Sequence, residues 1–263
     1  MTGPAARVAE ISEASATGVV AAVYDDIRRV TGVPTVALVY RILAVDADTL
    51  ETVWADLGPN LADARVRTGA RVLAGAPTGA LAPIAPSLVT VPLTPAAATL
   101  DGFARLNRLN VVGLTALRHG VAAPRASSPG ATEKETIPDG LPMADFAALP
   151  PSAIALLEAM SEPIAGGQRP LVVPSLFRYF AHDEQLLRAL WDALRPVVTD
   201  PAFERRVAAL REEAATLAGQ LPFRVRALPP GPALDVVERF LRTIPGMIVV
   251  GGLLAQALGV AEP

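Results

Sequence analysis

Two arginines, Arg41 and Arg178, lie in similar sequence surroundings in the two halves of the chain. A guanidinium group presents paired N–H donors that match a carboxylate, so two of them facing one space could hold an acidic ligand. Salt bridges that join the two halves are an alternative use for the same pair. Ser175, which follows Pro174, could orient a carboxylate through its hydroxyl, although a serine at a helix start also serves as a cap.

A base for hydrolysis could come from His182 or from the neighbouring Asp183. The ordinary pKa of histidine lies close to neutrality, which suits proton transfer. Asp46 and Asp183 each precede a helical pattern, which favours N-terminal capping over catalysis for both. Asn107 and Asn110 are polar residues in an apolar helical stretch. Either could contact a ligand in a pocket, and N-terminal capping is the alternative.

The composition excludes several classes of function. Of the 263 residues, 51% are hydrophobic and 19% are charged, as expected for a globular protein with an aliphatic core. Cysteine is absent, which excludes disulfides, thiolate ligands and cysteine nucleophiles. The two histidines show no metal-ligand spacing, so a metal site is not expected. The net charge of -3 argues against nucleic acid as a partner.

The chain repeats itself. Residues 38–59 align with residues 175–196 at a constant offset of 137, and both tryptophans of the protein match. A second match, between residues 100–106 and 234–240, follows in the same order. The identities in the first match are Arg41/Arg178, Ala44/Ala181, Asp46/Asp183, Leu50/Leu187, Trp54/Trp191, Leu57/Leu194 and Pro59/Pro196. The repetition predicts two tandem helical repeats, at 1–121 and 143–263, joined by an exposed linker at 122–142.

Apolar residues at spacings of three and four predict an all-α fold, and strand patterns are weak. One pair of equivalent helices is expected to end at Pro59 and Pro196. The other predicted helices cover residues 18–29, 61–73, 97–106, 111–121, 152–160, 203–217 and 233–258.

The last predicted helix is also the most apolar part of the chain. Residues 243–261 carry no charge over 19 positions, which is close to the length that crosses a bilayer. The equivalent stretch of the first repeat carries Arg118 and His119, which favours a buried core helix, kinked near Pro245, over a membrane anchor. The N-terminus lacks the apolar run of a signal peptide, so a cytoplasmic location is expected.

Three segments carry a family resemblance. Residues 33–44 follow the pattern V-P-x-V-A-x-x-x-R-x-L-A, residues 23–28 read VYDDIR, and residues 174–177 read PSLF. Together they resemble the group I 2-haloacid dehalogenases, which act on both D- and L-substrates. The resemblance implies two helical repeats forming an internal pseudo-dimer, distantly similar to alkyl hydroperoxidase D-like proteins, with the active site between them. It also implies cofactor-independent hydrolysis of small 2-halo carboxylic acids, in which an aspartate activates water and no covalent intermediate forms.

The chain departs from the family at the catalytic position. The family's aspartate directly follows a serine, whereas Leu176 follows Ser175 here, and leucine cannot accept a proton. Thr35 and Leu38 take the places of an aromatic pair that lines the family's pocket. Asn107 matches an asparagine of the family.

Three hypotheses follow from these observations. The protein is a hydrolase of 2-substituted acids with a rebuilt base, or an inactive relative that binds a small apolar carboxylate or metabolite between the repeats, or a structural helical protein that forms homo-oligomers. In the first two, a small-molecule carboxylic acid is the partner. The predicted substrate-binding residues are Thr35, Leu38, Arg41, Asn107, Ser175, Leu176 and Arg178.

Overall fold

Helices make up the regular structure of this protein. The computed structural model describes residues 8–73, 89–122, 137–167 and 173–260. In chain order the helices are η1 (Glu13–Ser15), α1 (Gly18–Thr31), α2 (Leu38–Leu43), α3 (Ala47–Ala62), α4 (Ala64–Arg71), α5 (Leu93–His119), η3 (Phe146–Ala148), α6 (Pro151–Ile164), α7 (Ser175–Tyr179), α8 (Glu184–Val198), α9 (Pro201–Ala218) and α10 (Pro232–Leu258). The described ranges contain one isolated bridge, between Val121 and Val225, and no strand. The predicted all-α fold is confirmed.

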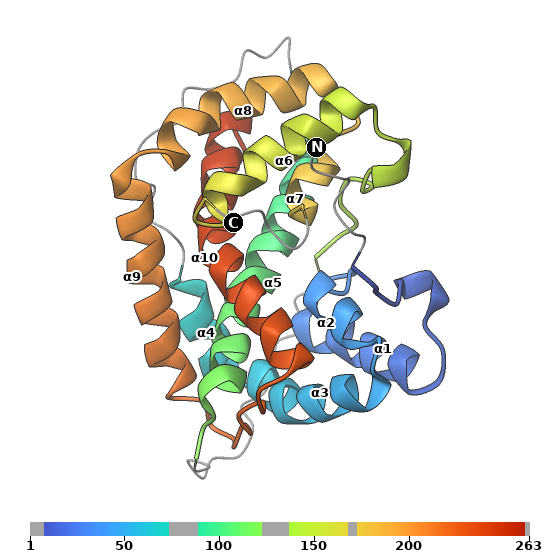
Figure 1. The fold of residues 1–263 in the computed structure, drawn as a ribbon, viewed down its shortest axis with the longest axis vertical. Helices are drawn as coiled ribbons and strands as arrows, with labels where there is room; N and C mark the ends of the chain where they lie inside the picture. The colour runs from blue at the N-terminus through green and yellow to red at the C-terminus, as the bar shows by residue number, and fades with distance from the viewer. Residues whose placement is uncertain (1–7, 74–88, 123–136, 168–172, 261–263) are drawn as a thin grey trace.

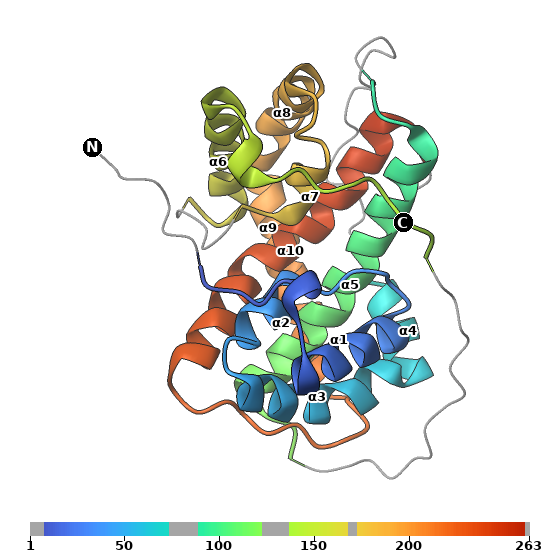
Figure 2. The ribbon, with the colours of Figure 1, turned by 90° about the vertical axis from the view of Figure 1, so that its right-hand side faces the viewer.

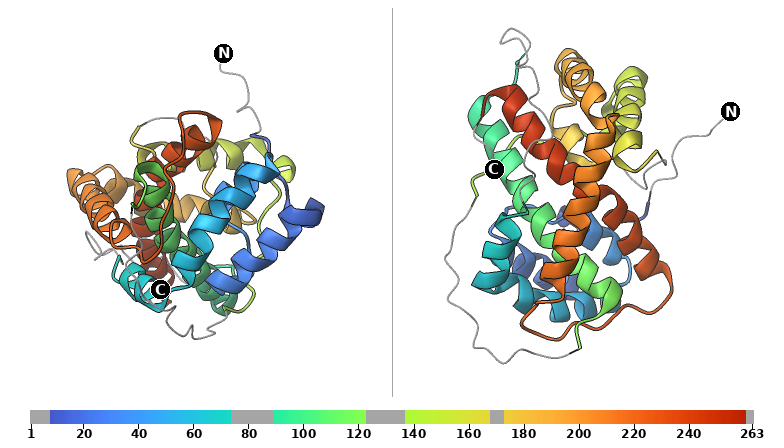
Figure 3. Two further views of the ribbon diagram at one scale, coloured as in Figure 1. Left: turned by 90° about the horizontal axis from the view of Figure 1, so that it is seen from below. Right: turned by 90° about the vertical axis from the view of Figure 1, so that its left-hand side faces the viewer.

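The helices α5 and α10 form the centre of the molecule. Each is 27 residues long, and they pack against one another along much of their length. In Figure 1 the helices α1 to α4 gather around one end of this pair, and α6, α7 and α8 lie toward the other. Figure 3 shows α9 running beside the same pair, with which it is in contact. The two central helices therefore have neighbours from both halves of the chain.

The helices of the two halves follow one another in a similar order. The first half has helices of 14, 6, 16, 8 and 27 residues, and the second has helices of 14, 5, 15, 18 and 27 residues. Only the fourth helix differs greatly in length. This order is the one that a duplication would produce, and the repeat boundaries and the pseudo-dimer remain predictions. Most of the predicted linker, residues 123–136, lies outside the described residues.

The prediction that two prolines end their helices is wrong. Pro59 lies inside α3, which continues to Ala62, and Pro196 lies inside α8, which continues to Val198. Each proline removes one intrahelical hydrogen bond, and only three residues of α3 and two of α8 follow the ring. Gly58 precedes Pro59 and has no Cβ to meet the proline ring. The helices can therefore continue past both rings.

The prediction of two separate helices at 97–106 and 111–121 is also wrong, because α5 is continuous through both. The break was expected at Asn107 and Asn110. Both side chains are buried on α5, and both lie on the wall of a cavity. A polar residue can occupy the interior of an apolar helix where it borders such a space.

The helix α10 is long and apolar enough to span a membrane, and no other helix among the described residues passes the same test. Its most apolar stretch has a mean hydropathy of 1.5, and 78% of that stretch is buried inside the protein. The helix runs without interruption through Pro245. At Gly246, a Cβ atom would lie 2.8 Å from Cγ2 of Ile164, so α6 approaches α10 closely there. Most of the apolar surface of α10 is thus covered by the protein itself.

Asn60 ties α3 to the segment between α9 and α10. Its side chain is fully buried, its Nδ2 donates to the Asp56 carbonyl at 2.8 Å, and its Oδ1 accepts from the Phe223 N–H at 2.9 Å. We expect Asn60→Ala to lower the free energy of unfolding by about 1–3 kcal/mol, because the Phe223 N–H loses its partner. Urea unfolding measures this loss. Gln220→Ala, at an exposed position, serves as the control. An equal loss of unfolding free energy in both variants would contradict the stabilising role of the Asn60 hydrogen bonds.

Candidate functional site

A cavity of about 430 Å³ lies where α2, α5, α7 and α10 meet. Its volume falls within the range of small-molecule sites in proteins. The described residues that line it belong to five segments of the chain. These are residues 33–41 at the start of α2, residues 98–110 of α5, residues 137–143, residues 174–179 at α7 and residues 239–247 of α10, together with Glu13.

One wall of the cavity is the strap, which we define as residues 137–144. The Ile137 N–H donates to the Gly32 carbonyl at 2.9 Å, and the Leu141 N–H donates to Oγ1 of Thr99 at 2.7 Å. At its other end the strap is tied to α7. Figure 2 shows this yellow-green segment crossing α5 on its way to the α6 and α7 side. The sequence predicted an exposed linker as far as residue 142, so these lining residues were missed.

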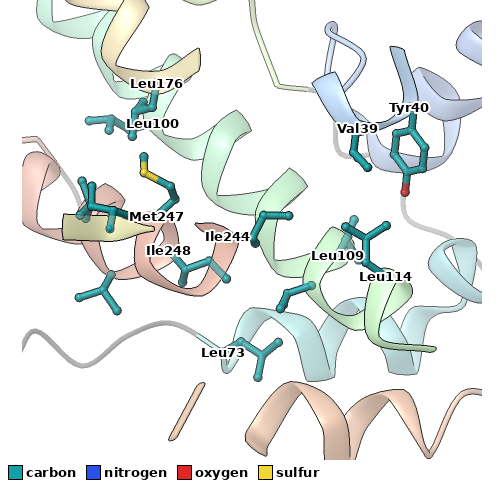
Figure 4. Packing of buried hydrophobic residues seen from close by; sticks show 14 of the residues in the cluster. Val39, Tyr40, Leu73, Leu100, Leu109, Leu114, Leu176, Ile244, Met247 and Ile248 are labelled. Atoms are coloured by element: carbon teal, nitrogen blue, oxygen red, sulfur yellow. The ribbon is translucent and has the colours of Figure 1, made fainter. Parts of the chain in front are cut away.

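The first residues of α2 and α7 both face the cavity. Leu38 begins α2, Ser175 begins α7, and both are lining residues. Leu176, one position further along α7, is not a lining residue and is 0% exposed. Figure 4 draws its side chain among the buried residues of the hydrophobic core. Successive helical residues are about 100° apart around the axis, so Ser175 and Leu176 point to different surroundings.

The two predicted arginines both line the cavity. Arg178 donates from Nε and Nη2 to the Ala144 carbonyl of the strap, at 3.3 and 2.9 Å. Arg41 donates from Nη2 to Oε1 of Glu10 at 3.0 Å, and its buried Nε has no hydrogen-bond partner in the described structure. Burial, and then the nearby charge of Arg41, lower the pKa of Arg178. Arg239 adds a third guanidinium on the α10 side, where it is exposed.

The described lining contains two carboxylates, from Glu13 and Asp139. Glu13 is held on both oxygens: Oε1 accepts from the Val36 N–H at 3.1 Å, and Oε2 accepts from Nη2 of Arg28 at 2.7 Å. Asp139 is exposed on the strap. A carboxylate becomes a stronger base when it is desolvated and lacks donors, and neither residue meets both conditions. No group of three His, Asp or Glu side chains that could hold a metal ion occurs among the described residues.

Asn107 and Asn110 both lie within α5, so neither caps a helix. Asn107 is 8% exposed, lines the cavity, and has no partner for its buried Nδ2 within the described structure. Asn110 also lines the cavity, and its Oδ1 accepts from the Tyr40 hydroxyl at 3.0 Å. Full burial raises the pKa of Tyr40 and keeps this hydroxyl a donor. Asn110 thus has a structural partner, whereas Asn107 retains an unused donor beside the cavity.

Thr35 and Tyr179 both line the cavity. Burial is the main cause that raises the pKa of Tyr179. The sequence predicted Thr35 but missed Tyr179, since α7 has only five residues and its helical pattern is too short to show which face is buried. Phe103 and Phe240 were missed for a different reason, because an aromatic residue on an amphipathic helix usually indicates only a core contact.

The other candidate bases do not belong to the described lining of the cavity. His182 is exposed, and its Nε2 lies 2.9 Å from the Pro142 carbonyl. Asp46 is the N-cap of α3, and Asp183 is the N-cap of α8. The capping role favoured by the sequence is confirmed for both aspartates. None of the three residues is among the described residues that line the cavity.

The cap at Asp183 predicts a dependence of stability on pH. The Thr90 hydroxyl and then the Leu186 N–H donate to this carboxylate and hold its pKa below the usual range. Because the pKa is lower in the folded protein, the ionised carboxylate stabilises the fold fully above about pH 4. This stabilisation is lost as the pH falls through the pKa of Asp183 in the folded protein. We expect Asp183→Ala to cost about 1 kcal/mol at pH 7 and progressively less below pH 4.

Urea unfolding of the wild type and Asp183→Ala across this pH range tests the dependence. Asp192→Ala, on the exposed side of the same helix, is the control and should change stability by less than about 0.5 kcal/mol. If the free energies of unfolding of Asp183→Ala and the wild type differ by a constant amount from pH 7 to pH 3, the carboxylate charge has no role in the stabilisation.

Solved structures of D-2-haloacid dehalogenases resemble this chain over nearly its whole length. A D-2-haloacid dehalogenase in complex with L-LA has a TM-score of 0.78 and 18% identity, with 96% of this chain and 97% of that chain covered. A mutant form has a TM-score of 0.77 and 16% identity, with 96% of each chain covered. A mutant in complex with D-2-CPA has a TM-score of 0.75 and 17% identity, with 96% of this chain and 97% of that chain covered.

Neither a protein-family model nor a curated protein sequence matches this chain. The likeness to solved structures therefore rests on the arrangement of helices, as expected at such low sequence identity. The chain has the all-α fold of the D-2-haloacid dehalogenases.

Proposed function

We propose that this chain is a 2-haloacid dehalogenase-like protein that binds a small carboxylic acid in the central cavity without hydrolysing it. One observation carries the proposal: the cavity brings Arg41 and Arg178 together, while its described lining offers no desolvated carboxylate free of donors. The fold shared with the D-2-haloacid dehalogenases supports an acid as the ligand. A cytoplasmic location and self-association remain predictions from the sequence.

Two buried side-chain atoms in the described lining lack a hydrogen-bond partner, and both are donors. Nε of Arg41 and Nδ2 of Asn107 are buried without partners in the described structure. A buried donor without a partner costs about 1–3 kcal/mol, and a ligand atom that accepts from it removes this cost. A carboxylate has acceptors only, and its negative charge would also offset the repulsion between Arg41 and Arg178. A carboxylate is therefore the head group that best satisfies this cavity.

Hydrolysis would need a group that takes a proton from water next to the ligand. The position that the family resemblance assigns to the base is Leu176, which is buried in the core. Glu13 is engaged by Arg28 and by the Val36 N–H. A hydrolase with a rebuilt base would have to use Glu13 or Asp139, and it remains the competing hypothesis.

Calorimetric titration and halide release together test the proposal. The wild type is titrated with 2-chloropropionate of each hand and with the neutral 2-chloropropionamide, and free chloride is measured in the same samples. We expect both acids to bind at least about tenfold more tightly than the amide, because a charge-assisted hydrogen bond contributes about 1.5–3 kcal/mol. We expect no chloride above the uncatalysed level.

The Arg41→Gln variant tests the assignment of the head group, because Arg178 also holds the strap through Ala144. It should weaken binding of the acids at least about tenfold and leave the weak binding of the amide nearly unchanged. Arg188→Gln is the matched control, since Arg188 is an exposed residue of α8 paired with Glu184. Chloride release by the wild type would overturn the non-hydrolytic proposal, and equal affinity for acid and amide would overturn the role of the arginines.

A further inference from the structure

The volume of the cavity is large for the ligands of a haloacid-binding site. A cavity of about 150 Å³ in another protein takes up benzene, which has six non-hydrogen atoms. A three-carbon 2-halo acid such as 2-chloropropionate also has six. The cavity here, about 430 Å³, is nearly three times as large. A three-carbon acid would leave most of this space to water.

The cavity has a polar end and an apolar end, and the strap connects them. At the polar end, the Ala144 carbonyl accepts from Arg178, whose backbone carbonyl accepts in turn from the Ala144 N–H. At the other end, Ile137 is tied to Gly32. Between these points the strap is fixed to α5 through Thr99. Arg178 and Gly32 are therefore bound to opposite ends of the strap, at Ala144 and Ile137.

The apolar end is a small buried cluster of its own. Val33, Leu106 and Ile137 pack together with Ala98, apart from the main core, and all four line the cavity. Gly102 lies beside this cluster, where a Cβ atom would be 3.4 Å from Cγ1 of Val33. The glycine leaves open a space that a side chain would occupy. Further apolar lining comes from Phe103, Phe240, Ile244 and Met247.

We infer that the ligand is a medium-chain aliphatic carboxylic acid of about eight to twelve carbons, an inference that rests on the proposed function. Its carboxylate accepts from Arg41 and Arg178, and its chain extends along the strap to Val33, Leu106 and Ile137. Such an acid has about ten to fourteen non-hydrogen atoms, which the cavity accommodates. The apolar lining matches the hydrocarbon chain of the ligand, and the arginine pair matches its carboxylate.

Titration of the wild-type protein with unbranched acids from propionate to dodecanoate tests the inference. Each methylene group transferred from water into an apolar site tightens binding about three- to fourfold. We expect the dissociation constant to fall by this factor per carbon up to about eight to ten carbons and then to level off, where the end of the cavity is reached. Octanol should bind at least about tenfold more weakly than octanoate, because it lacks the charge.

The Gly102→Leu variant places a side chain in the apolar end. It should weaken the binding of decanoate at least tenfold and that of propionate less than threefold, so the preference for the longer acid is lost. Thermal unfolding checks that the variant is folded. If Gly102→Leu does not fold, Leu106→Trp is used in its place, because it fills the apolar end of the cavity from a neighbouring position.

The outcomes separate the two proposals. Equal dissociation constants for propionate and decanoate, or a decanoate affinity that neither variant lowers, would overturn the medium-chain inference and leave the acid-binding function standing. Failure of every acid to bind, whatever its length, would overturn the proposed function and the inference together.

Discussion

Leu176→Asp is expected to lower the free energy of unfolding by about 4 kcal/mol or more at pH 7, a large part of the stability of an ordinary domain. The substitution removes a leucine that is 0% exposed, and truncating such a side chain costs about 2–5 kcal/mol by itself. It also buries a carboxylate among apolar side chains of the core. An aspartate at this position should therefore damage the fold before it can supply a base.

The pH dependence of the loss identifies its cause. Burial raises the pKa of such an aspartate, so the folded protein tolerates only the protonated form. The cost should accordingly be smallest below about pH 4 and grow as the pH rises. Urea unfolding at several pH values measures it, with Leu176→Met as the control, which should cost less than about 1.5 kcal/mol. A Leu176→Asp variant as stable as the wild type at pH 7 would contradict the buried placement.

Ser175→Asp offers the informative comparison. Ser175 is partly exposed and lies on the cavity wall, so a carboxylate there remains in contact with the open space. We expect this variant to stay within about 1 kcal/mol of the wild type. Its release of chloride from 2-chloropropionate shows whether the cavity can support water attack once a base is present.

Gly140→Ala is expected to reduce both stability and acid binding. A Cβ atom on Gly140 would lie 2.3 Å from Oγ1 of Thr99 and 3.1 Å from the Cα and N atoms of the same residue. The backbone of α5 cannot give way, so the strap must move and the Leu141 N–H would lose its bond to Thr99. Overpacking of this kind costs about 1–3 kcal/mol of unfolding free energy. Because the strap is a wall of the cavity, we also expect octanoate to bind at least about tenfold more weakly.

Gly252→Ala in α10 is the matched control. No atom lies within 4 Å of the added Cβ, and alanine is favoured over glycine inside a helix by up to about 1 kcal/mol. Thermal unfolding and octanoate titration of both variants complete the test. Normal octanoate affinity in Gly140→Ala would show that the strap does not shape the binding site.

The apolar spacing in the sequence predicted the all-α fold correctly, because the apolar faces of the helices are buried in the core. Asp46 and Asp183 were predicted as caps from local sequence, and capping depends on local geometry alone. Pro59 and Pro196 misled the prediction, since a proline near the end of a helix disturbs it little. The structure, not the sequence, shows that α5 continues through its buried asparagines.

The site was predictable only in part. Six of the seven predicted binding residues line the cavity, and Leu176 does not, because a one-residue step around a short helix changes its surroundings. The strap was missed because its proline, glycine and charged residues are typical of an exposed linker. Ile137 and Leu141 are buried in it by contacts with distant parts of the chain, which a local pattern does not contain.

A crystal structure of the protein with 10-bromodecanoate would show how an acid lies in the cavity, because the anomalous signal of bromine locates the end of the hydrocarbon chain. We expect the carboxylate at Arg41 and Arg178 and the bromine among Val33, Leu106 and Ile137. A bromine peak at the arginines, or a ligand bound outside the cavity while the cavity stays empty at saturating concentration, would contradict this binding mode.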